Sequence, residues 1–192
     1  MGHIADKEFI RGEVPMTKQE VRAVSVAKLM LRENSVLIDV GAGTGSVGIE
    51  AATYIPFGKV YAIERKSEGV ELIKINREKF GIKNLEIIQG TAPDDLCIKK
   101  FDRMFIGGSA GQMESLVEYF IKYADSKSII VVNAITLETV AETKNAFEKY
   151  NIKNYEVINL TVARGKKAGK YTMMYGENPI YIITGEKGET NE

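Results

Sequence analysis

The chain has 192 residues, enough for one domain with a substantial hydrophobic core, and its 26 basic residues are balanced by 26 acidic ones. Balanced charge gives no general indication of a nucleic-acid or membrane partner, and a lone cysteine, Cys97, excludes an internal disulfide. With one histidine, His3, the composition argues against a histidine–cysteine zinc site and against a serine–histidine or cysteine–histidine hydrolase. No apolar run has membrane-spanning length and no signal-peptide pattern opens the chain, so we expect one cytoplasmic domain over residues 1–192, without a metal.

The first predicted helix opens at Thr17, shortly after Pro15. Thr17 and Glu20 have the spacing of a capping box, in which two side chains satisfy free backbone amides of the first turn. The apolar residues predicted to share one face of this helix are Val21, Val24, Ala27 and Leu31. We expect residues 1–32, an extension followed by this helix, to contribute to the functional site.

Short apolar runs then alternate with helical patterns, which is typical of a parallel sheet covered on both faces. Strands are predicted at residues 36–40, 60–63, 85–88, 103–106 and 128–132. Helices are predicted from Ser46, over 67–80 with Gly81 as cap, around Met113, Leu116, Val117 and Phe120, and from Thr136 with Leu137, Val140, Ala141 and Phe147 facing inward. The last two strands, 155–160 and 180–184, are separated by a predicted loop rather than a helix, so we expect them to pair antiparallel at one edge. The predicted fold class is α/β, with a Rossmann-like arrangement.

A glycine-rich turn follows the first strand. Glycines alternate from Gly41 to Gly45, which removes side chains from a loop that a ligand must approach closely. Ser46 stands where a dinucleotide fingerprint has its third glycine, and the motif alone is also compatible with a tight turn that binds nothing. Glu64 ends the next strand, at about the distance where ribose hydroxyls are bound. Asp39 lies inside the apolar strand and needs hydrogen-bond partners there, so we expect it to brace the loop. Together these residues indicate a nucleoside-containing cofactor.

The pattern from Asp39 to Gly45, followed by Glu64, resembles the S-adenosylmethionine loop of class I methyltransferases, whose seven-stranded sheet has an antiparallel last strand. The resemblance implies S-adenosyl-L-methionine as the cofactor, with its methionine and ribose against the loop and both ribose hydroxyls on Glu64. Many members bind adenine through an acid after the third strand. Here Thr91 and Ala92 hold that place, and a hydroxyl or a backbone N–H is the expected contact.

Three further segments resemble the decarboxylating precorrin methyltransferases of cobalamin biosynthesis. They are Phe9 with Pro15–Ala23, Phe105–Gly108, and Asn178–Ile180. This resemblance implies methylation of carbon 15 of cobalt-precorrin-6B, or of a metal-free precorrin, with loss of the ring C acetate carboxyl group as carbon dioxide. It also implies a homotetramer and a contact between Thr17 and the cofactor. The expected cofactor-binding residues are therefore Thr17, Gly41, Ala42, Gly43, Thr44, Gly45, Glu64, Thr91 and Ala92.

A precorrin is a flat macrocycle ringed by carboxylates, so its site needs cations and apolar surface. Lys18 and Arg22 are four residues apart and share a helical face. Residues 163–170, the basic stretch, carry four cations and no acid, and tyrosines and methionines follow directly. The expected substrate-binding residues are Lys18, Arg22, Gly107, Gly108, Arg164, Lys166 and Lys167. A solvated connector is the alternative interpretation of the basic stretch.

Two rival functions remain open at this level. An RNA methyltransferase would use the basic stretch to bind phosphates. A non-catalytic subunit would keep the fold without the cofactor. We predict no catalytic residue, because a conjugated macrocycle can supply an electron-rich carbon without a protein base.

Overall fold

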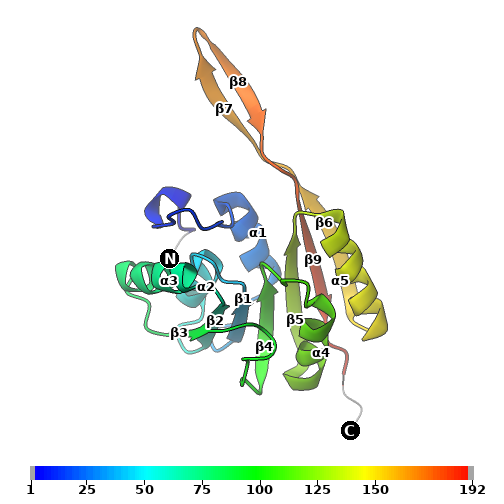
Figure 1. Ribbon diagram of the computed structural model, residues 1–192. Helices are drawn as coiled ribbons and strands as arrows, with labels where there is room; N and C mark the ends of the chain where they lie inside the picture. The colour runs from blue at the N-terminus through cyan, green and yellow to red at the C-terminus, as the bar shows by residue number, and fades with distance from the viewer. Residues whose placement is uncertain (1–2, 190–192) are drawn as a thin grey trace.

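The computed structural model of the protein describes residues 3–189. Its centre is a seven-stranded sheet with the order β3-β2-β1-β4-β5-β9-β6 (Figure 1). The strands are β1 (Val36–Val40), β2 (Lys59–Glu64), β3 (Leu85–Gln89), β4 (Phe101–Ile106), β5 (Ala124–Ala134), β6 (Lys153–Leu160) and β9 (Ile180–Glu186). Pairs are parallel except that β9 runs antiparallel to both β5 and β6. The predicted mostly parallel sheet, with its last two strands paired antiparallel, is confirmed.

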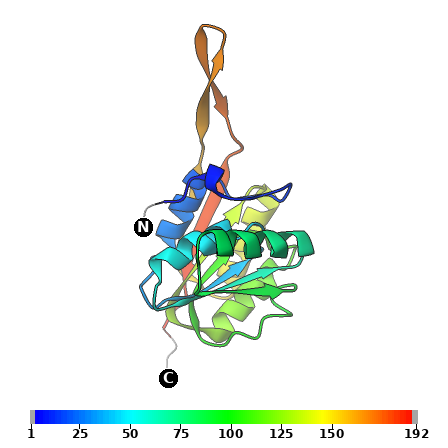
Figure 2. The same cartoon turned by 90° about the vertical axis from the view of Figure 1, so that its left-hand side faces the viewer.

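Helices cover both faces of this sheet (Figures 1 and 2). They are α1 (Gln19–Lys28), α2 (Ser46–Tyr54), α3 (Ser67–Lys79), α4 (Met113–Tyr123) and α5 (Leu137–Lys149), with a 3₁₀ turn, η1 (Asp6–Glu8), before them. Side chains of α1, α2 and α3 share one hydrophobic cluster, and those of α4 and α5 share the other. Alternation along β1 feeds both clusters, because Ile38 and Val40 belong to one and Leu37 to the other. No helix among residues 3–189 is long and apolar enough to cross a membrane.

The segment between β6 and β9 was predicted to be a loop, and this prediction is wrong. It forms a two-stranded hairpin of β7 (Ala163–Ala168) and β8 (Tyr171–Gly176), with Gly169 at φ +60° in its turn. The β7–β8 hairpin projects from the body of the molecule (Figures 1 and 2). It leaves the sheet at the edge where the parallel strands have their carboxyl ends.

Two predicted helix faces also need correction. The N-cap of helix α1 is Lys18, one residue later than expected, and it makes no side-chain capping hydrogen bond. The predicted capping box of Thr17 and Glu20 is therefore wrong. Its buried residues are Val21, Arg22, Ser25 and Val26, whereas Ala27 is exposed. In α5, Thr136 does cap the helix and Phe147 is buried, but Leu137 and Ala141 are exposed. Both faces were predicted from the spacing of apolar residues alone. In the structure, polar residues that form hydrogen bonds within the chain take some of the buried positions.

Candidate active site

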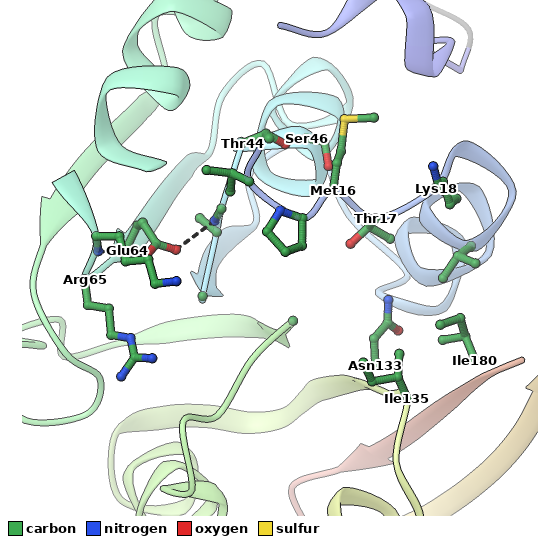
Figure 3. A pocket seen from close by; sticks show the side chains of 18 of the residues that line it. Met16, Thr17, Lys18, Thr44, Ser46, Glu64, Arg65, Asn133, Ile135 and Ile180 are labelled. Atoms are coloured by element: carbon green, nitrogen blue, oxygen red, sulfur yellow. Dashed lines mark hydrogen bonds between the residues drawn. The ribbon is translucent and has the colours of Figure 1, made fainter. Parts of the chain in front are cut away.

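A pocket of about 470 Å³ lies at the carboxyl ends of β1, β2, β4 and β5 (Figure 3). This is the edge at which open parallel sheets bind ligands. Its walls come from residues 13–18 before α1, residues 41–46 between β1 and α2, the end of β2, and the start of β9. Predicted residues that line it are Thr17, Lys18, Gly41, Ala42, Gly43, Thr44, Glu64 and Gly107.

The glycine loop has a backbone that only glycine accommodates well. Gly41 has φ +70°, and a Cβ atom there would lie 2.8 Å from the carbonyl oxygen of Gly108. Gly43 has φ +56°, and its Cβ would lie 3.1 Å from the carbonyl oxygen of Pro15. The loop is therefore a close meeting point of three segments, and its bare backbone forms part of the pocket wall.

Glu64 is held in the pocket by backbone amides. Its Oε2 accepts from the N–H of Gly43 and its Oε1 from the N–H of Lys66, both at 2.9 Å. The residue is only 8 % exposed. Each carboxylate oxygen has a second lone pair, so the fixed carboxylate can still accept from a ligand hydroxyl.

Asp39 lies beneath the loop and is fully buried. Its Oδ2 accepts from the N–H of Gly48 at 2.9 Å, so it braces the first turns of α2 rather than the loop itself. Its Oδ1 has no hydrogen-bond partner among residues 3–189. Burial raises the pKa of Asp39 to about 7, and the nearby Glu64 carboxylate adds to this effect, while the Gly48 N–H opposes it.

Asn76 of α3 joins the N-terminal segment to the glycine loop. Its Oδ1 accepts from Ile10 N–H at 2.8 Å, and its Nδ2 donates to the carbonyl oxygens of Ile10 at 2.6 Å and Thr44 at 3.0 Å. The side chain is fully buried. One amide group thus fixes the wall formed by residues 13–18 relative to the loop that it faces.

Arg22 does not reach the pocket, which corrects the predicted substrate contact. Its side chain is fully buried, and its Nε donates to Glu50 Oε2 at 2.8 Å. Its other donors are taken by Asp6 Oδ1 and by the carbonyl oxygens of Ile4 and Thr17. A guanidinium whose donors are satisfied internally is unsuited to hold a substrate carboxylate, and its position on α1 instead anchors the N-terminal segment.

The basic stretch forms β7 of the hairpin, and none of its residues lines the pocket of its own chain. Arg164 donates to Glu177 at 2.7 Å and also to Glu20, so its charge is paired within the chain. Lys166 Nζ lies 5.3 Å from the ring centroid of Tyr175. Arg164, Lys166 and Lys167 therefore do not line the pocket of their own chain, and their contact with a substrate stays a prediction.

The remaining predicted residues lie beside the main pocket. Thr91 and Ala92 line a small adjoining pocket of about 70 Å³, together with Gly41 and Glu64. Gly45 is the N-cap of α2 at φ +77°, where a Cβ would lie 3.1 Å from Ile73. Gly108 contacts Gly41 through its backbone.

Sequence reasoning missed several residues that line the pocket, namely Met16, Asn133, Ile135, Thr139 and Ile180. Asn133, Ile135 and Ile180 lie at the end far from Glu64 (Figure 3). Asn133 carried a usable signal, because a polar residue at the carboxyl end of an apolar parallel strand lies at the ligand-binding edge. The apolar residues carried none, since they fit equally well in the core.

The doubly covered sheet, the glycine loop after β1 and the acid at the end of β2 define a class I, Rossmann-like methyltransferase. The model of the precorrin methyltransferase domain matches residues 8–187, and the chain belongs to this family. The chain is 42 % identical over 185 residues to the probable cobalt-precorrin-6B C(15)-methyltransferase (decarboxylating) of Pyrobaculum calidifontis, covering 94 % of each chain.

Two solved structures have the same fold over nearly their whole length. One is the precorrin-6y C5,15-methyltransferase of Geobacter metallireducens, with a TM-score of 0.90 and 38 % identity, covering 96 % of this chain and 97 % of that chain. The other is the precorrin 8W decarboxylase of Methanobacterium thermoautotrophicum, with a TM-score of 0.89 and 32 % identity, covering 95 % and 98 %.

Proposed function

We propose that this protein methylates carbon 15 of cobalt-precorrin-6B, using S-adenosyl-L-methionine, and decarboxylates the ring C acetate. The observation that carries the proposal is family membership combined with a pocket that has a ribose-type carboxylate at one end. Relatives that match 94 % and 96 % of the chain are named as probable cobalt-precorrin-6B C(15)-methyltransferases (decarboxylating).

The pocket fits the cofactor in three respects. The glycine loop presents bare backbone to the pocket, because Cβ atoms on Gly41 and Gly43 would collide with neighbouring backbone. Glu64 is fixed by two amides and can still accept further hydrogen bonds. Thr44 Oγ1, in the same loop, is a buried hydroxyl without a partner among residues 3–189, and a cofactor carboxylate would satisfy it. When bound, S-adenosylmethionine supplies an electrophilic methyl group. We propose that Thr91 and Ala92, which line the adjoining small pocket, then contact the adenine.

The protein's own contribution to the reaction is binding and orientation. The pocket of about 470 Å³ is within the range that holds one drug-sized ligand, so a macrocycle must extend over its mouth. Lys18, which lines the pocket, can pair with a macrocycle carboxylate, and Gly107 contributes bare backbone to the lining. Holding the nucleophilic carbon in line with the methyl group, without water between them, is the main source of rate.

We also propose that the protein is a homo-oligomer, a tetramer by family resemblance, joined through the β7–β8 hairpin. Four large side chains of the hairpin are exposed: Tyr171, Met173, Met174 and Tyr175. A projecting two-stranded ribbon with this much exposed apolar surface is marginal in water and gains stability from a partner. Light scattering after gel filtration should give a mass well above one chain, and Met174→Lys should lower it. A monomeric wild-type protein would contradict the proposal.

Two measurements test the enzymatic function. Calorimetry with S-adenosylhomocysteine should show one site per chain, and the absence of heat would favour a non-catalytic subunit. Mass spectrometry after incubation with cobalt-precorrin-6B should show gain of a methyl group and loss of carbon dioxide. Gain without loss would make the protein a different precorrin methyltransferase, and methylation of transfer RNA in its place would favour the RNA alternative.

A further inference from the structure

One polar group in the pocket remains unexplained by cofactor binding. Asn133, near the end of β5, lines the pocket, and its amide nitrogen is buried with no hydrogen-bond partner among residues 3–189. An unpaired buried donor costs about as much free energy as a lost hydrogen bond. Such a group is retained where a ligand completes it.

The orientation of this amide is set by Ser25 of α1. Ser25 Oγ lies 3.0 Å from Asn133 Oδ1 and 2.9 Å from the carbonyl oxygen of Val21, and its single proton can go to only one of them. The Val21 carbonyl lies four residues before Ser25 in α1, so the helix already supplies it with a backbone donor. Donation to Asn133 Oδ1 satisfies an acceptor that has no other partner within the described part of the chain, and this leaves both Nδ2 protons for the pocket.

Asn133 lies at the end of the pocket opposite Glu64, the proposed ribose acceptor (Figure 3). In Figure 3 the amide points toward Thr17, with Lys18, Ile135 and Ile180 nearby, whereas Glu64 lies at the opposite end. Val132 pairs with Ile106 across β5 and β4, so Asn133 is next to Gly107 along the sheet edge. Gly107 has no side chain, so at this part of the pocket lining Asn133 supplies the polar side chain and Gly107 only backbone.

We infer that the Asn133 amide donates a hydrogen bond to a rim carboxylate of the bound tetrapyrrole, with Ser25 as its positioning residue. The inference rests on the proposed function. Carboxylates are the acceptors that the rim of a precorrin presents, and Lys18 at the same end provides the matching charge. A neutral amide orients a carboxylate while adding less ground-state stabilisation than a second cation would.

Two substitutions with opposite chemistry test the direction of this hydrogen bond. Asn133→Ala removes the donor and should raise the KM for cobalt-precorrin-6B about ten- to a hundredfold, the range for a hydrogen bond to a charged group. Asn133→Asp presents a carboxylate of the same shape and should raise it further. Both variants should bind S-adenosylhomocysteine within about twofold of wild type. Asn159→Ala, at an exposed position on β6, is the matched control and should leave the KM unchanged.

Four other outcomes would overturn the inference, and each would show a different role for Asn133 or for the protein. An unchanged KM in Asn133→Ala would show that the amide does not contact the substrate. A smaller defect in Asn133→Asp than in Asn133→Ala would show that the side chain accepts a hydrogen bond instead. Loss of S-adenosylhomocysteine binding would assign Asn133 to the cofactor. Wild-type protein without turnover of cobalt-precorrin-6B would remove the proposed function itself, and this inference with it.

The role of Ser25 has a separate readout. Ser25→Ala releases the amide, so it should raise the KM by less than Asn133→Ala, with kcat retained. Combined with Asn133→Ala it should add nothing further, because the positioned group is already absent. Additive effects would show that Ser25 acts only through the packing of α1.

Discussion

Replacement of Asp39 by asparagine should change how stability depends on pH. Asparagine keeps an acceptor oxygen for the Gly48 N–H and removes the group that ionises. The pKa of Asp39 rises from 3.8 to about 7 on folding, chiefly through burial. Between these two values the folded chain binds more protons than the unfolded chain, so the free energy of unfolding falls as pH rises. At 1.36 kcal/mol per pKa unit, the difference corresponds to a loss on the order of 4 kcal/mol.

The measurement is urea unfolding of wild type and Asp39→Asn at pH values from about 4 to about 8. The stability of wild type relative to the variant should be greatest near pH 4, fall up to about pH 7, and stay constant above it. Asp94→Asn, at an exposed position, is the control for changing one aspartate and should show no such trend. A difference between wild type and Asp39→Asn that is independent of pH would refute the reasoning, because it would mean that the buried carboxyl group ionises at its ordinary pKa.

Three other predictions concern the site and its support. Glu64→Ala should weaken S-adenosylhomocysteine binding by about 1–3 kcal/mol in calorimetry, since the ribose hydroxyls lose their acceptor; wild-type affinity would remove Glu64 from the site. Gly41→Ala should lower the free energy of unfolding by about 1–3 kcal/mol from strain alone and also impair cofactor binding. Gly81→Ala, with a similar φ but no neighbour within 4 Å, should show the strain without the binding defect. Arg22→Met should cost about 3–5 kcal/mol in urea unfolding by removing the guanidinium partner of the buried Glu50 carboxylate, against about 0–1 kcal/mol for Lys28→Ala in an exposed ion pair.

The sheet and the part of the pocket formed by the glycine loop and Glu64 could be predicted because their signals are local. Apolar runs, positive-φ glycines and an acid at a strand end are properties of consecutive residues, and Gly81 capped its helix as expected. The role of Arg22 could not be predicted, because it depends on Glu50 and Asp6, which are distant in sequence. A basic side chain on a helix usually faces solvent, and only the folded structure shows that Arg22 is buried.

The β7–β8 hairpin was missed for a different physical reason. Alternate residues of the basic stretch give no contrast between a buried and an exposed face, since both faces of the ribbon are largely exposed in one chain. Asn133 was missed because its buried nitrogen becomes informative only when its lack of a partner is seen.

The Asn76 bridge makes the N-terminal segment and the ligand thermodynamically linked. Residues 13–18 form a pocket wall close behind Ile10, which is hydrogen-bonded to Asn76, and the same amide holds the carbonyl of Thr44. Consider a ligand that binds only when this wall is in place. The free energy by which the wall then increases ligand affinity equals the free energy by which the bound ligand stabilises the wall. Cofactor binding should therefore slow hydrogen exchange of amides near Ile10, beyond the residues that the cofactor touches. In the proposed enzyme, residues 10–18 take part in this way in the binding equilibrium.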